Sequence, residues 1–315
     1  MPTLEQISSA RERISHHLHV TPVTTARLLG NQAGVELFLK CENFQKTGSF
    51  KARGALNKVS ILDESARRRG VVTVSAGNHA QALAWAAGAL NVRATVVMPA
   101  AASQTKADAS AGYGAAVIRH GTAFEAFERA QAIAAERGLV FVHPFDDDDV
   151  MAGAGTTALE ILEQTPDVDA VVVPIGGGGL IGGIAAAINQ LQPSVRVYGV
   201  EPQGAAVMRA SLDAGRAVRL QSVETIADGL AAPMAGTLTY EIVRRYVHDV
   251  VVVSDVEIAS AVRTLLIRTK LLAEPAGAAA VAAILERKLP LRMGERIVAV
   301  VSGGNVDLAT LKGML

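Results

Sequence analysis

The sequence has little cysteine, few aromatic residues and no excess of charge of either sign. Its 315 residues include one cysteine, Cys41, which excludes an internal disulfide framework and a cysteine-based zinc cluster. Aromatic residues make up 4% of the chain, and 30 basic residues balance 30 acidic ones. The basic, aromatic-interleaved surface that binds nucleic acid is therefore absent, and a small-molecule partner is expected instead.

Long hydrophobic runs are also absent. The longest apolar stretches, such as Pro275–Leu285, are well short of the roughly 20 residues that span a bilayer. Met1–Ser15 carries mixed charge and has no apolar core of signal-peptide length. We therefore expect a soluble, cytoplasmic protein with no membrane partner.

Short Val/Ile-rich runs alternate with Ala-rich helical patterns along the chain. This alternation predicts an α/β fold, with parallel-rich sheets flanked by helices on both faces. The length exceeds the usual size of one domain, so two lobes around a cleft are expected. The predicted strands are Val71–Val74, Ala94–Met98, Ala115–Ile118, Leu139–Val142, Ala170–Val173, Val195–Val200, Val250–Val253 and Ile297–Val301.

Lys51 follows a Thr-Gly-Ser turn at the start of an apolar helical pattern. The pKa of a surface lysine is near ~10.4, but a desolvated lysine beside cationic or helix N-terminal groups has a lower pKa. Such an amine can form a Schiff base with an aldehyde. The alternative is a solvated lysine at a helix start, and this short motif taken alone favours that alternative.

Four consecutive glycines, Gly176–Gly179, join the apolar run Val171–Val173 to the helical pattern Ile181–Leu191. Backbone N–H groups in such a loop can approach an anion closely, and the helix N-terminus adds a favourable partial charge. The segment lacks the lysine-serine pair of a nucleoside triphosphate loop and the spacing of the dinucleotide fingerprint. It predicts a cradle for a small phosphate monoester, because a tight turn alone would need only one or two glycines.

Two further predicted strands end in polar residues. Ser302–Asn305 follows Ile297–Val301, and Ser75–His79 follows Val71–Val74. Side chains at the carboxyl ends of parallel strands face the ligand crevice. The helical pattern from Ala80 to Leu90 would point its N-terminal amides at a substrate carboxylate.

Taken in their order along the chain, these motifs resemble those of the fold-type II pyridoxal-phosphate enzymes, in the branch of serine/threonine dehydratases (ammonia-lyases) and serine racemases. The resemblance covers nearly the whole chain and includes Thr225–Gly229 and Ala273–Ala278. It implies a two-lobed, tryptophan synthase β-like fold. Residues 61–147 would form the small lobe, and residues 1–60 and 148–315 the large lobe that binds pyridoxal 5'-phosphate. Cys41 matches a strand of the family and is expected to be structural.

The resemblance also assigns roles to residues. Lys51 would form the Schiff base with the cofactor and then remove the Cα proton of the substrate. The phosphate would be held by Gly176, Gly177, Gly178, Gly179 and Leu180. The cofactor ring would be contacted by Phe50, Asn78, Glu274 and Ser302, with Asn78 on the ring hydroxyl and Ser302 on the pyridine nitrogen. The substrate carboxylate would be held by Ser75, Ala76, Gly77, Asn78 and His79.

Several of these residues have a simpler structural interpretation. Ser302 would cap the following turn, and Glu274 would cap the helix that Pro275 begins. For His79, packing at a helix N-terminus is favoured over general base catalysis. The run Asp146–Asp149 could suggest a metal site, but adjacent residues do not converge on one point, and an acidic helix start in a solvated turn is favoured.

The implied activity is conversion of L-threonine or L-serine to 2-oxobutanoate or pyruvate plus ammonia, by β-elimination of water. Ser302 favours elimination, because a hydroxyl cannot keep the pyridine nitrogen protonated as an aspartate would. Ala76 favours a dehydratase over a racemase, since racemases of the family carry a serine there and alanine transfers no proton. His120–Phe124 likewise lacks the arginine that racemases have just downstream.

Other functions stay open. These are serine racemisation, dehydration of another β-hydroxy amino acid such as 3-hydroxyaspartate, β-replacement as in cysteine synthases, and cofactor binding without turnover. The last is disfavoured because a binder needs no base at Cα. β-Replacement enzymes carry a different loop, similar to Thr/Ser-Gly-Asn-Thr, where this chain has Ser75–His79.

The sequence departs from the family pattern at two places. The cation site of the racemases corresponds to Glu201, Ala205 and Val207, and valine in place of aspartate makes a tight magnesium site unexpected, although a looser monovalent or water-filled site stays open. Ala154 replaces the usual glutamine and is expected to remove polar groups near the cleft. Relatives are commonly dimers or tetramers, so a homo-oligomer is expected. Feedback control by isoleucine would act through an appended domain after Leu315, and it is not expected.

Overall fold

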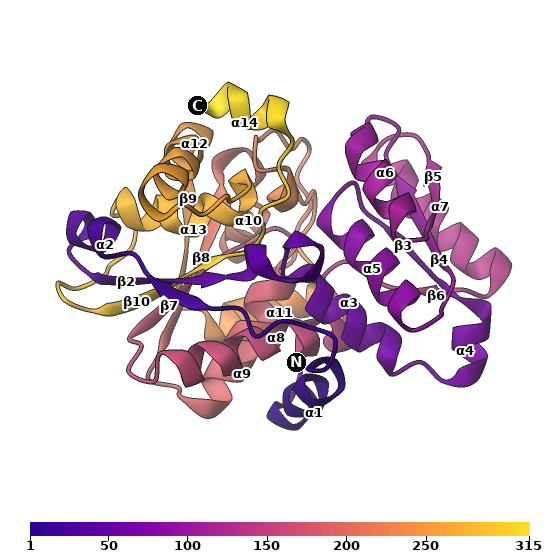
Figure 1. Cartoon of the computed structure of the whole chain (residues 1–315), viewed down its shortest axis with the longest axis horizontal. Helices are drawn as coiled ribbons and strands as arrows, with labels where there is room; N and C mark the ends of the chain where they lie inside the picture. The colour runs from indigo at the N-terminus through magenta and orange to yellow at the C-terminus, as the bar shows by residue number, and fades with distance from the viewer.

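The computed structural model describes all 315 residues and contains two β-sheets that lie side by side (Figure 1). The larger sheet has six strands in the order β1 (Val23–Thr25), β2 (Glu36–Cys41), β10 (Arg296–Val301), β7 (Ala170–Pro174), β8 (Arg196–Pro202) and β9 (Asp249–Val253). The smaller sheet has four strands in the order β5 (Ala116–Arg119), β4 (Ala94–Met98), β3 (Val71–Val74) and β6 (Val140–Phe141).

Helices cover both faces of the six-stranded sheet. The apolar residues of its inner strands point to both sides, and each set joins a separate core cluster. Strands buried on both faces read as near-continuous Val/Ile runs, as β7 and β10 do. One face packs against α2 (Arg27–Ala33), α12 (Asp255–Thr264), α13 (Pro275–Leu285) and α14 (Leu308–Met314). The other packs against α1 (Leu4–Ile14), α8 (Asp148–Gln164), α9 (Gly179–Leu191), α10 (Val207–Ala214) and α11 (Thr237–Tyr246).

The four-stranded sheet is wholly parallel and is covered in the same way. Its apolar residues alternate, so that Val71 and Val96 join one core cluster while Val72 and Val97 join another. On one face lie α3 (Lys51–Ser60), α5 (Asn78–Ala89) and α6 (Gln104–Gly112), and on the other lies α7 (Ala123–Arg137). The short helix α4 (Glu64–Arg69) connects α3 to β3.

Short helical turns complete the structure. These are the 3-10 turns η1 (Glu42–Phe44), η2 (Lys46–Gly48), η3 (Gln203–Ala205) and η4 (Asp228–Leu230), and the π-helical turn η5 (Leu265–Thr269). None of the helices combines the length and the apolar character that crossing a bilayer requires.

The predicted α/β class is confirmed, and every predicted strand forms within two residues of its expected ends. The list of predicted strands missed β1 and β2, which pair antiparallel to each other in an otherwise parallel sheet. Glu36 and Lys40 interrupt the apolar run of β2. The remaining signal was the alternation of Leu37, Leu39 and Cys41, all of which are buried.

The lobe boundaries at residues 61 and 147 stay a prediction. The chain enters the four-stranded sheet at β3 and leaves it after β6, and α8 then packs on the six-stranded sheet. The core beneath the four-stranded sheet also includes Leu56 and Val59 of α3, which precede the predicted boundary.

Candidate active site

A cavity of about 280 Å³ lies between the two sheets, where several parallel strands end. The residues just after β3, β7 and β10 contribute to its wall, as expected for the carboxyl ends of parallel strands. Every residue predicted to contact cofactor or substrate lines this one cavity: Phe50, Lys51, Ser75, Ala76, Gly77, Asn78, His79, Gly176, Gly177, Gly178, Gly179, Leu180, Glu274 and Ser302.

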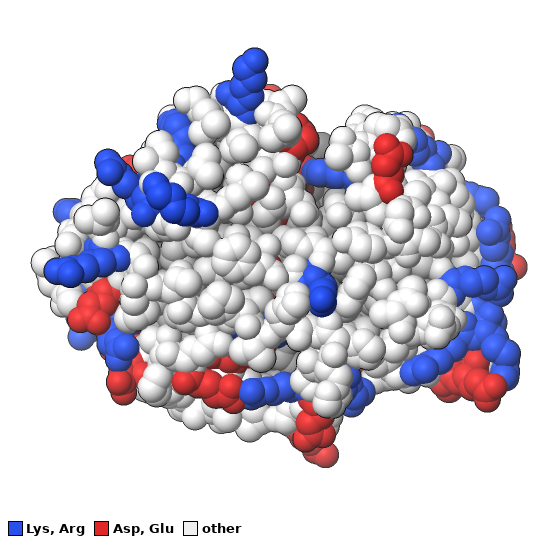
Figure 2. All heavy atoms as spheres, in the orientation of Figure 1, with Lys and Arg blue, Asp and Glu red and all other residues white.

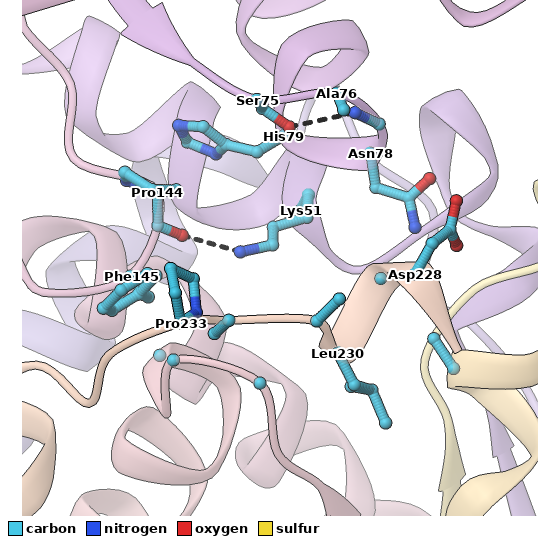
Figure 3. Close-up of a pocket in the computed structure, with 18 of the residues that line it drawn as sticks. Lys51, Ser75, Ala76, Asn78, His79, Pro144, Phe145, Asp228, Leu230 and Pro233 are labelled. Carbon is cyan, nitrogen blue, oxygen red and sulfur yellow. Dashed lines mark hydrogen bonds between the residues drawn. The ribbon is translucent and has the colours of Figure 1, made fainter. Parts of the chain in front are cut away.

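Lys51 is the first residue of α3, and its side chain points into the cavity (Figure 3). The Nζ atom donates a hydrogen bond to the carbonyl oxygen of Pro144 at 2.6 Å and lies 5.1 Å from the centroid of the Phe50 ring. Desolvation in the cavity wall lowers the pKa of Lys51 to about 8. A larger fraction of this amine is therefore neutral, and so nucleophilic and basic, than in a solvated lysine.

The glycine loop is shaped so that no side chain fits on it. A Cβ atom on Gly177 would lie 2.3 Å from the ring of Phe145, and one on Gly178 would lie 2.7 Å from Thr239. Gly178 also has φ of 97° at the N-cap of α9, a left-handed conformation that favours glycine. Bare backbone therefore faces the cavity at a helix N-terminus, which fits the phosphate group of a cofactor.

The segment after β6 ties Lys51 to the glycine loop, and the sequence did not show this. Pro144 accepts the bond from Lys51, while the next residue, Phe145, packs on Gly177 and Gly179. The carboxylate of Asp146 then accepts hydrogen bonds from the backbone N–H groups of the first residues of α11, at 3.0 to 3.1 Å. One short segment thus contacts both the lysine and the loop.

The four aspartates divide between two helices. Asp147 is the N-cap of α8 and accepts from the backbone N–H groups of Asp149 and Val150 at 2.9 and 3.0 Å. The expected acidic helix start is present, since Asp148 and Asp149 lie in the first turn of α8. The interpretation of the whole run as one solvated turn is wrong for Asp146, because its carboxylate caps the distant helix α11.

The buried Glu274 and the half-buried Asn78 form a polar pair in the cavity wall. The Nδ2 of Asn78 donates to Oε1 of Glu274 at 2.6 Å, and the Nδ2 of Asn305 donates to Oδ1 of Asn78 at 2.9 Å. Burial, reinforced by the charge of Asp228, raises the pKa of Glu274 to about 8. Glu274 occupies the N-cap position of α13, but its side chain makes no capping hydrogen bond, so the capping interpretation is wrong.

Ser302 and His79 are both buried. The carbonyl oxygen of Ser302 accepts a hydrogen bond from the backbone N–H of Phe50 at 3.1 Å, which joins the end of β10 to the start of α3. His79 lies in the first turn of α5, with Nε2 3.4 Å from the carbonyl oxygen of Val142 and no partner for Nδ1. Burial and the nearby charge of Lys51 lower the pKa of His79 well below its ordinary value, consistent with a neutral, packed histidine.

Several residues at the mouth of the cavity were not predicted as site residues. Lys106 of α6 forms an ion pair with Asp228 of η4, and both line the cavity. Phe124 and Phe127 of α7 line it as well, and the guanidinium of Arg219 lies over the Phe124 ring. These residues are far apart in sequence, so no motif spacing joins them. Asp228 does belong to the Thr225–Gly229 motif, and Phe124 to the segment His120–Phe124, both of which were noted in the sequence.

The two departures from the family pattern lie away from the cavity wall. Ala154 is buried in the core between α8 and the six-stranded sheet and does not line the cavity, and an effect on the cleft stays a prediction. The carboxylate of Glu201 accepts from the backbone N–H groups of Met208 and Arg209 at 2.7 and 2.8 Å, and burial raises the pKa of Glu201 to about 7. The start of α10 therefore binds this carboxylate.

The geometry agrees with a comparison against known protein families. The family model described as pyridoxal-phosphate dependent enzyme matches residues 14–303. The chain belongs to this family. The predicted cofactor, pyridoxal 5'-phosphate, is thereby confirmed, and the bare glycine cradle beside the half-buried Lys51 fits it.

Relatives of this pyridoxal-phosphate dependent enzyme have several activities. The L-threonine ammonia-lyase of Thermotoga maritima is 48% identical over 98% of this chain and 77% of its own length. An L-threo-3-hydroxyaspartate ammonia-lyase of a Pseudomonas species is 39% identical over 100% of this chain and 99% of its own length. The structure of maize serine racemase superposes with a TM-score of 0.95 at 40% identity, covering 99% of this chain and 96% of that one. The predicted recognition of the dehydratase and racemase branch is thus confirmed.

Proposed function

We propose that the protein is an ammonia-lyase that converts L-threonine, L-serine or both to 2-oxobutanoate or pyruvate, releasing ammonia after β-elimination of water. The observation that carries the proposal is the convergence of Lys51, the glycine cradle and the Ser75–His79 loop on one cavity. L-Threonine ammonia-lyases among the relatives support it.

Separate elements would hold the cofactor. Gly176–Gly179 and Leu180 would bind its phosphate at the N-terminus of α9, with Phe50 against its ring. Asn78 would donate to the ring hydroxyl, beside Glu274, and Ser302 would meet the ring nitrogen. The bound cofactor supplies an electron sink next to the substrate Cα.

Lys51 would carry out the proton transfer. With a pKa near 8, its amine is partly neutral at physiological pH and can accept the proton from the substrate Cα. The Nζ atom donates a hydrogen bond to the Pro144 carbonyl, which holds the amine in the cavity. The same carbonyl would orient the amine during proton transfer.

The Ser75–His79 loop would bind the substrate carboxylate. It lies at the start of α5, where the first backbone N–H groups of the helix lack intrahelical partners and attract an anion. The methyl side chain of Ala76 offers no proton to the second face of Cα. Elimination is therefore favoured over racemisation, and the neutral hydroxyl of Ser302 favours it further.

The decisive experiment is a panel assay of the cofactor-loaded protein. L-Serine, L-threonine and L-threo-3-hydroxyaspartate are supplied, and the released 2-oxo acid and any D-serine are measured in the same tubes. We expect 2-oxo acid to dominate and Lys51→Ala to abolish it. Lys46→Ala is the matched control, because Lys46 precedes the same turn but does not line the cavity. Dominant D-serine would contradict the role given to Ala76.

We also propose that the protein acts in the cytoplasm as a homo-oligomer, a dimer or tetramer, in line with the family resemblance. Light scattering after size-exclusion chromatography tests the oligomeric state. A monomer at micromolar protein concentration would exclude the proposed homo-oligomer.

A further inference from the structure

The charged side chains at the mouth of the cavity are unequally paired. Lys106 is neutralised by Asp228, with which it forms an ion pair. Arg219 lines the same cavity and makes no side-chain hydrogen bond or ion pair with any carboxylate. The mouth therefore carries one uncompensated positive charge, on a side chain that solvent and solutes can reach.

Arg219 is held in place by an aromatic ring from the other side of the cavity. It lies in the loop between α10 and η4, where its backbone bridges to Met234, and its Cζ atom is 4.3 Å from the ring centroid of Phe124 in α7. A guanidinium stacked on a ring keeps its N–H edge available for in-plane hydrogen bonds. That edge matches the geometry of a carboxylate.

Apolar side chains also line the cavity. Phe124 and Phe127 line it together with Pro99, Pro233 and Met234. The methyl group of threonine would need only such a surface, and a free guanidinium adds nothing to its binding. An anionic β-substituent would gain a charge-assisted hydrogen bond there.

We propose that Arg219 binds the β-carboxylate of an acidic β-hydroxy amino acid, and so extends the substrates of the proposed ammonia-lyase from L-threonine and L-serine to L-threo-3-hydroxyaspartate. This inference rests on the proposed function, whose reaction at Cα is common to these substrates. It adds the substrate class that the cavity mouth accepts.

The test compares two variants with a control. Arg219→Met removes the charge and keeps an apolar side chain against Phe124, while Arg219→Lys keeps the charge and loses the planar fork. Arg216→Met is the matched control, since Arg216 is exposed in the same loop and does not line the cavity. The first readout is the ratio of kcat/KM for L-threo-3-hydroxyaspartate to kcat/KM for L-threonine.

We expect Arg219→Met to lower this ratio about 10- to 100-fold, as loss of a charge-assisted hydrogen bond implies. Arg219→Lys should lower it less, and Arg216→Met should leave it unchanged. An unchanged ratio in Arg219→Met would overturn the proposal while leaving the ammonia-lyase activity standing.

A second readout does not depend on turnover. L-Aspartate and L-2-aminobutyrate lack the β-hydroxyl group and cannot lose water, and their binding is followed by the absorbance of the cofactor-loaded protein. Arg219→Met should weaken L-aspartate binding relative to L-2-aminobutyrate by the same factor. If no β-hydroxy amino acid is dehydrated but this binding difference appears, the proposed function fails and the role of Arg219 stands. Equal weakening of both ligands would overturn that role.

Discussion

Lys51 and Glu274 are ionisable side chains of one cavity that burial drives toward their neutral forms. For Lys51 the neutral amine is the form that proton transfer at Cα requires. For Glu274 the neutral acid costs stability, because folding must keep a proton that the unfolded chain releases above its ordinary pKa. The buried Glu274 therefore lowers the free energy of unfolding by an amount that depends on pH.

Glu274→Gln should relieve this cost. The folded pKa of Glu274 is raised from 4.5 to about 8, so the wild type loses stability as the pH rises through that window and levels off above it. The glutamine variant has no proton to hold, and Asn78 can still donate to its Oε1. Urea unfolding of cofactor-free protein should show little difference at pH 4.5 and a gain on the order of 1–4 kcal/mol at pH 8.

The exposed Glu286, at the end of the same helix α13, provides the control. A gain of the same size in Glu286→Gln would contradict the assignment of the pH dependence to Glu274. If Glu274→Gln gave a constant difference at every pH, the pKa of Glu274 would have to be the same in the folded and unfolded states.

At the scale of elements, the glycine loop works because Phe145 fills the space beside it. Gly177→Ala would place a Cβ atom 2.3 Å from the Phe145 ring, which must then move along with the segment that contacts Lys51. We expect cofactor affinity to fall at least about tenfold, since backbone N–H groups of a displaced loop no longer converge on the phosphate. The affinity is measured by adding pyridoxal 5'-phosphate to the cofactor-free protein and following the absorbance.

Gly313→Ala is the matched substitution. Gly313 lies in α14, has nothing within 4 Å of an added Cβ and should accept alanine without loss of cofactor affinity. Equal cofactor affinity in Gly177→Ala and Gly313→Ala would show that the loop tolerates a side chain and does not hold the phosphate through bare backbone.

At the scale of the whole molecule, a buried ionic network connects the elements around the site. Arg53 of α3 binds the carboxylates of Glu42 and Glu160 at 2.7 to 2.8 Å, and Lys40 binds Glu160 at 2.6 Å. These residues come from β2, η1, α3 and α8, and all are buried. Since α3 begins at Lys51, the network also fixes the helix that carries this lysine.

Arg53→Met should cost about 3–5 kcal/mol in free energy of unfolding, because it leaves buried carboxylates without their main partner. Arg68→Met, which breaks the exposed ion pair with Glu64 on α4, should cost less than about 1 kcal/mol. Chemical denaturation of both variants at pH 7 gives the comparison. Similar costs for the two would mean that the buried network adds no more than a surface pair.

The sequence predicted the parts of the site that lie on short, contiguous motifs. Gly176–Gly179 and Ser302 each follow a recognisable strand, so their convergence followed from the rule for parallel strands. Lys51 follows a recognisable turn, and the family resemblance placed it with them. The contacts of Phe145 with Gly177 and of Arg219 with Phe124 join residues far apart in the chain. No local periodicity records such pairs, and Asp146 was misread because its capping partner lies in another helix.

The position of β10 in the larger sheet bears on when the cavity can form. This strand pairs with β2 on one side and β7 on the other, and the latter two have no direct contact in the sheet order. During synthesis the four-stranded sheet, all of whose strands precede residue 142, can assemble early. Ser302, which lines the cavity, follows β10 and is synthesised after all the strands. This part of the cavity wall is therefore completed last, whereas the lysine and the glycine loop are joined through Pro144 and Phe145, which are synthesised much earlier.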